Sequence, residues 1–112
     1  TLQAVRGHAY AGILDAPGEA DLTHHVDFEA LIRAAADAGA ELFGPIPQMV
    51  LLSRLGIAAR AEALLAKATS EQAETIRSAA HRLVHPREMG EIFKALALVH
   101  PALPAPPGFE GT

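Results

Sequence analysis

The chain has 112 residues, 13 acidic and 9 basic side chains, a formal net charge of −4, and neither cysteine nor tryptophan. This length is typical of about one domain. The scattered basic residues exclude the clustered positive charge of a nucleic-acid or polybasic membrane surface. Without cysteine, disulfides and thiolate chemistry are excluded too, and no apolar run reaches the roughly 20 residues of a bilayer span.

Residues 1–25 contain turn-forming residues and show no sustained helical or strand periodicity of apolar side chains. Gly7, Gly12, Pro17 and Gly18 separate short apolar pairs, and such residues favour turns over regular elements. We therefore expect residues 1–25 to be mostly loop. Because the sequence opens on Thr1 and not on methionine, we also expect a piece of a longer protein, or a processed one.

Residues 27–38 predict an amphipathic helix. Its apolar face, at helical spacing, consists of Phe28, Leu31, Ile32, Ala35 and Ala36. Asp27 is placed to cap the first turn, and Val26 and Leu31 are spaced for a hydrophobic staple. Gly39 supplies the C-terminal stop, because glycine adopts a left-handed cap at little cost.

A strand and two helices are expected next. The apolar run 40–45 lies between a helix and Gly44-Pro45, which is typical of a strand after an αβ connection. Pro47 suits the first turn of the following helix, where its missing N–H is harmless. Gly56 predicts a break, after which a second helix continues to about Lys67.

The last third contains one clear helix and one ambiguous segment. Thr69 and Gln72 have the spacing of a capping box, and Pro86 ends the helix that they begin. By period, residues 91–99 suit either a helix or a buried strand. The proline-rich tail, residues 102–112, should be irregular.

The histidines raise the question of a metal site. His24 and His25 are adjacent, so their side chains diverge, and Asp27 already has a capping role. His81 and His85 share a helical face but lack a nearby third ligand. Both groups favour ordinary surface or capping residues, and we predict no metal site. Lacking also a nucleophile elbow and a phosphate loop, the chain alone lacks the parts of a self-sufficient enzyme.

Five blocks occur in a fixed order along the chain: TLQAVRGH, APGEADLTHHVDF, GPIPQ, RLGIAAR and MGEIFKALAL. Together they resemble the C-terminal third of the MidA-type S-adenosylmethionine-dependent methyltransferases, the family of the mitochondrial complex I assembly methyltransferase. The resemblance covers essentially the whole chain up to the tail. It implies an α/β chain, the C-terminal part of a doubly wound class I methyltransferase fold, helix-rich with about two strands near 40–45 and 91–98.

The resemblance also implies a division of the chain. Residues 1–101 would be the C-terminal part of the methyltransferase domain, followed by the tail. Within them, 1–26 would be a substrate-side loop and 47–84 a helical elaboration. S-adenosylmethionine would be bound mainly by residues outside this chain, because the glycine-rich cofactor turn is absent here.

The implied activity is methyl transfer to a protein, with arginine as acceptor. Carboxylates that orient a guanidinium are the expected contribution. Candidate substrate-binding residues are Gln3, His8, Asp21 and Gln48, each of which would line an acceptor channel or merely tie loops together; no catalytic residue is identified.

The expected partners are a protein substrate and the missing N-terminal half or another copy of the chain, without nucleic acid or membrane. High alanine content and the absence of cysteine favour a bacterial cytoplasm. The alternative is a non-enzymatic helical module for interaction or oligomerisation, and residues upstream of Thr1 would discriminate between the two.

Overall fold

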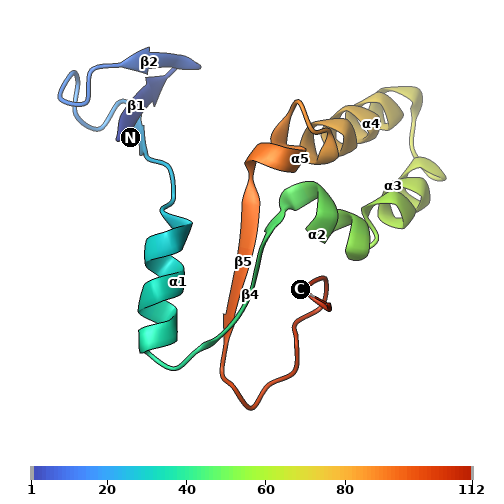
Figure 1. Cartoon of the computed structure of the whole chain (residues 1–112). Coiled ribbons are helices and arrows are strands. Elements are labelled where there is room, and N and C mark those ends of the chain that lie inside the picture. Colours follow the sequence, from blue (N-terminus) through green and yellow to red (C-terminus); the bar gives the residue numbers. More distant parts are fainter. Residues whose placement is uncertain (1, 112) are drawn as a thin grey trace. The chain divides into compact units, whose positions relative to one another are not determined.

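The computed structural model describes residues 2–111 and divides into two compact units (Figure 1). The first comprises residues 1–30 and the second residues 31–112. Each unit has its own small sheet, so each is described separately.

The first unit is a three-stranded antiparallel sheet. Its strands are β1 (Gln3–Arg6), β2 (Ala9–Ala11) and β3 (Asp21–Thr23), in the order β2-β1-β3. Gly7 and His8 form the turn between β1 and β2, at φ 56° and φ 64°, the left-handed conformation that a tight hairpin needs. Most of residues 2–25 lie outside strands, as expected, but the three strands themselves were not predicted. Strands of three or four residues are too short for the alternation of apolar and polar residues to be recognised in the sequence.

Helix α1 (Phe28–Asp37) confirms the first predicted helix. The Oδ1 atom of Asp27 accepts a hydrogen bond from the Ala30 N–H at 3.0 Å, the expected N-cap. Gly39, at φ 81°, ends the helix and donates its N–H to the Ala36 carbonyl. Capping is a local interaction, so the sequence alone predicts it well.

The second unit is built on an antiparallel pair, β4 (Glu41–Pro47) and β5 (Lys94–Val99). Both strands were predicted, although β5 begins later than expected because residues 89–92 form a short helix, α5 (Met89–Ile92). The register shifts between Phe43 and Ile46. Pro45 lies within the shift and has no N–H to donate to the ladder.

Three further helices connect the two strands: α2 (Gln48–Arg54), α3 (Ile57–Leu65) and α4 (Ser70–Val84). Gly56 separates the first two at φ 88°, as predicted. Thr69 caps α4, and the predicted capping box is present: Gln72 donates its N–H to Thr69 Oγ1 at 3.2 Å and its Oε1 accepts from the Thr69 N–H at 3.0 Å. No helix in the described part of the chain is both long and apolar enough to cross a membrane.

The tail after β5 is irregular, as predicted, yet it is anchored. It returns towards α2, where Arg54 Nη1 donates to the Gly108 carbonyl at 3.1 Å (Figure 1). Phe109 is only 7% exposed, and its ring lies against Gly44 of β4. Phe109 and Ile46 are thus core residues of the second unit.

Candidate functional site

The antiparallel register of the first unit gathers polar residues on one face of its sheet. Val5, in the central strand, lies opposite Tyr10 on one side and Asp21 on the other. One row away on the same face, Gln3 lies opposite Thr23. Directly opposed residues share a face and alternate residues return to it. We call these five residues the polar sheet face.

Both faces of this sheet carry exposed side chains, but of different kinds. Ala4, on the other face, is 1% exposed and lies opposite Ala11 and Leu22. On the polar sheet face, Tyr10 is 79% exposed and Asp21 is exposed as well. The other face exposes Leu22, at 60%, and Arg6, so what distinguishes the polar sheet face is an exposed aromatic ring near an exposed carboxylate.

The net charge of the chain is concentrated in the first unit. Residues 1–30 contain five Asp and Glu and one Arg, whereas residues 31–112 contain eight acidic and eight basic side chains. That one arginine, Arg6, pairs with Glu19 at 3.1 Å. Within the described residues the carboxylate of Asp21 has no ion pair. Such a field attracts cationic groups.

The four candidate substrate-binding residues lie in three different environments. Gln3 and Asp21 share the polar sheet face. His8 lies in the hairpin turn at positive φ. Gln48 begins α2 and donates Nε2–H to the Leu83 carbonyl at 2.8 Å, tying α2 to the last turn of α4. The structure therefore brings together two of the four.

Tyr10 was not singled out from the sequence. The signal was present: Gly7 and His8 form a two-residue turn, and a two-residue turn fixes the register of the residues on either side. That register places Tyr10 on the same face as Asp21. Predicting this register from the sequence would first have required recognising residues 3–6 as a strand.

The histidines have local roles. His24 Nδ1 is 2.8 Å from the His25 carbonyl. The His81 and His85 rings lie 4.5 Å apart, and His85 Nδ1 accepts from the Arg87 N–H. Among residues 2–111, no three histidine, aspartate or glutamate side chains are placed to hold a metal ion together. The geometry thus offers no support for a metal centre.

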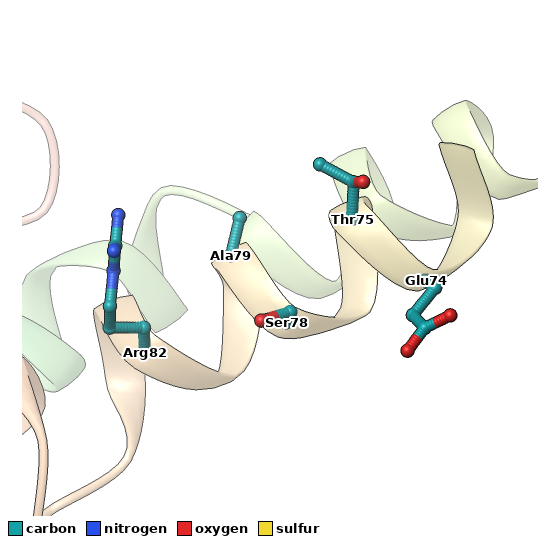
Figure 2. A pocket seen from close by; sticks show the side chains of 5 residues that line it. All are labelled: Glu74, Thr75, Ser78, Ala79 and Arg82. Carbon is teal, nitrogen blue, oxygen red and sulfur yellow. The ribbon is translucent and has the colours of Figure 1, made fainter. Parts of the chain in front are cut away.

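A hollow of about 390 Å³ lies along helix α4 (Figure 2). Its lining consists of Glu74, Thr75, Ser78, Ala79 and Arg82. All five come from one helix, and Figure 2 shows Glu74 and Arg82 directed to different sides. Ligand pockets bury most of their ligand in a concave site. A depression along a single helix lacks the opposing wall that this needs.

The strand-to-helix connections show whether the chain could hold a nucleotide-type cofactor. Such cofactors bind at a glycine-rich turn between a strand and a helix. The link from β3 to α1 is His-His-Val-Asp, and β4 passes directly into α2. In the described residues neither connection contains glycine, so neither supplies the glycine-rich turn at which such a cofactor binds.

This chain is similar to one protein-family model and to curated proteins of animals. Residues 1–46 match a family model described as an S-adenosyl-L-methionine-dependent methyltransferase. The mitochondrial protein arginine methyltransferase NDUFAF7 homolog of Drosophila melanogaster is 41% identical over 88% of this chain, and mitochondrial NDUFAF7 of Mus musculus is 40% identical over 88%. The chain spans 23% of the length of each.

Two crystal structures from Burkholderia thailandensis match nearly the whole chain. One, of an uncharacterized protein, has a TM-score of 0.83 and 29% identity over 99% of this chain and 30% of that one. The other, of a protein bound to S-adenosyl-homocysteine, has a TM-score of 0.78 and 31% identity over 99% of this chain and 29% of that one.

The mitochondrial relatives also correct one expectation. We expected a bacterial cytoplasmic protein, and the curated relatives named above are mitochondrial proteins of animals, which contradicts it. Alanine content and the absence of cysteine do not determine where in the cell a protein is located. Cysteine usage reflects redox conditions, which is too coarse a property to identify a compartment.

Proposed function

Since the chain belongs to the MidA-type S-adenosylmethionine-dependent methyltransferases, as the C-terminal portion of such a protein, we propose that the whole protein methylates an arginine side chain of a protein substrate. One observation carries this: 41% identity over 88% of the chain to a protein named as an arginine methyltransferase. The family membership removes the main reason for considering a non-enzymatic helical module.

The proposal divides the work between this chain and the rest of the protein. Residues outside the chain bind most of the S-adenosylmethionine, because neither strand-to-helix connection described above has a glycine-rich turn. Residues 1–26 lie on the acceptor side, and residues 47–84 form a helical elaboration of the methyltransferase domain, which extends to residue 101. When bound, S-adenosylmethionine would supply its sulfonium methyl group to a guanidinium nitrogen; the S–CH3 bond would break to leave S-adenosyl-homocysteine, and the nitrogen would lose a proton to solvent.

The acceptor-side role of residues 1–26 rests on their charge and on the polar sheet face. A guanidinium must be held in line with the methyl donor, and orientation of this kind is a large part of a transfer rate. Gln3 and Asp21 can hold it, since both lie on that face. His8 and Gln48 remain candidates without a shared surface.

The expected partner of the β4–β5 sheet is a further strand that would pair with one of its outer edges. In the described residues β4 and β5 pair only with each other, so each has an unpaired outer edge. Unpaired edges favour pairing with another strand. We propose that the rest of the methyltransferase domain supplies it, and that the isolated chain associates with a second copy instead.

Two measurements test the proposal. The whole protein should transfer a methyl group from S-adenosylmethionine to an arginine-containing peptide and not to the matched lysine peptide, as followed by mass spectrometry. In calorimetric titration the whole protein should bind S-adenosylmethionine and the isolated 112-residue chain should not. Transfer to lysine only would contradict the acceptor, and micromolar cofactor binding by the isolated chain would contradict the division of work.

A further inference from the structure

We propose that the polar sheet face binds the guanidinium group of the acceptor arginine, with the Tyr10 ring on one side of it and the Asp21 carboxylate on the other. The inference rests on the proposed function and deepens it, because it names the surface that selects the acceptor. It also assigns Tyr10 a part in specificity that no sequence motif indicated.

The register sets the spacing of the two side chains. Tyr10 and Asp21 flank Val5 from the two neighbouring strands. Two strand spacings separate their Cα atoms by about 9.5 Å. A cation stacks within about 6 Å of an aromatic centroid, and its N–H groups reach a carboxylate oxygen at about 3 Å. One planar guanidinium therefore fits between the ring and the carboxylate.

The floor of this gap suits the rest of an arginine side chain. Val5 lies between the two flanking residues and is half-buried. Arginine places its apolar stem along such a surface while its charged end remains polar. Gln3 and Thr23, one row away, add a side-chain amide and a hydroxyl beside the stem.

Charge complementarity identifies the occupant as a cation. Residues 1–30 carry five acidic side chains and one basic one, and the basic one, Arg6, is held by Glu19 at 3.1 Å. Arg6 alternates with Val5 along β1, so its side chain leaves from the other face. Asp21 is thus available to a cation from outside.

The pair also favours arginine over lysine. A guanidinium is planar, stacks on a ring and can donate two parallel N–H groups to a carboxylate, whereas an ammonium is a compact, strongly hydrated charge. A ring and a carboxylate on opposite sides of one gap match the planar group. We therefore expect selection by shape as well as by charge.

The test uses the whole protein and three peptides that differ at one position: arginine, lysine, and citrulline, the neutral isostere of arginine. Three quantities are measured: the Kd of each peptide with S-adenosyl-homocysteine present, so that no transfer occurs, and the KM and kcat for the arginine peptide. Tyr10→Ala and Asp21→Asn are the test variants. Asp15→Asn removes one charge from the same unit away from the strands, and Leu22→Ala removes an apolar side chain from the other face.

The wild type should bind the arginine peptide more tightly than the other two. Tyr10→Ala should raise its Kd and KM about two- to fivefold, the range of an exposed cation–π contact, while Tyr10→Phe should keep wild-type affinity because the ring remains. Asp21→Asn should raise both by a similar factor, as for an exposed ion pair, and should reduce the preference over citrulline by that same factor. Both controls should leave Kd and kcat unchanged.

The outcomes separate this inference from the proposed function. Equal effects of Asp21→Asn and Asp15→Asn, or no effect of Tyr10→Ala on Kd, would overturn the inference even if methyl transfer to arginine is observed. Binding that depends on Tyr10 and Asp21 without any transfer to arginine would support the inference and overturn the proposed function. If Tyr10→Ala unfolds, Tyr10→Leu replaces it, because leucine keeps an apolar side chain on the strand but cannot stack on a cation, and an unchanged Kd for the arginine peptide would overturn the inference.

Discussion

Replacing Gly90 by alanine should destabilise the second unit severely. A β-carbon at this position would lie 2.0 Å from the Val84 carbonyl oxygen and 2.9 Å from the His85 oxygen. Comfortable contact needs about 3.5 Å, so the shortfall is about 1.5 Å against backbone atoms, which cannot rotate away. Overpacking by a methylene typically costs about 1–3 kcal/mol, and we expect at least about 3 kcal/mol here, because the end of α4 must move.

Gly56 provides the matched control for this prediction. A β-carbon there meets nothing within 4 Å, although the residue has φ +88°, so Gly56→Ala should cost only the about 1–2 kcal/mol of a left-handed alanine. Urea unfolding of both variants, followed by circular dichroism, gives the two free energies. A loss for Gly90→Ala equal to or smaller than that for Gly56→Ala would refute the close approach of α5 to the end of α4.

Three further substitutions have predictable costs. Phe109→Ala should lower the free energy of unfolding by about 3–4 kcal/mol, because the residue is only 7% exposed. A melting temperature within about 2 °C of wild type corresponds to well under 1 kcal/mol and would contradict the place of Phe109 in the core. Asp27→Ala should cost about 1 kcal/mol through loss of the α1 cap, whereas Asp27→Asn should restore most of it in the same denaturation assay. Gln48→Leu should cost about 1–2 kcal/mol, since the Leu83 carbonyl loses its donor; an unchanged free energy of unfolding would contradict this link between α2 and α4.

The helices could be predicted because their ends are encoded locally. Asp27 and Thr69 each bond to an amide three residues away, and Gly39 and Gly56 adopt the left-handed conformation that breaks a helix. Such contacts are visible in a short window of sequence. The resemblance to a known family also resolved residues 91–98 towards a strand, which periodicity alone left open.

The sheet of the first unit could not be predicted in the same way. Gln3 pairs with Thr23, and Val5 with Asp21, across a stretch that contains β2 and the irregular residues 12–20. Neither strand shows alternation over enough residues to be recognised. Asp21 was still identified as a candidate, from the family resemblance, while Tyr10 required the register. The buried position of Phe109 was missed for a related reason: a tail rich in proline is usually read as disordered.

The anchored tail limits how the second unit can change in evolution. A β-carbon on Gly108 would lie 2.5 Å from Cδ1 of Leu51, and Arg54 holds the Gly108 carbonyl. Gly108 also has φ +86°, which strains any other residue whatever space surrounds it. A smaller residue at position 51 would therefore not make a side chain at position 108 acceptable, and we expect glycine to be retained there among related sequences.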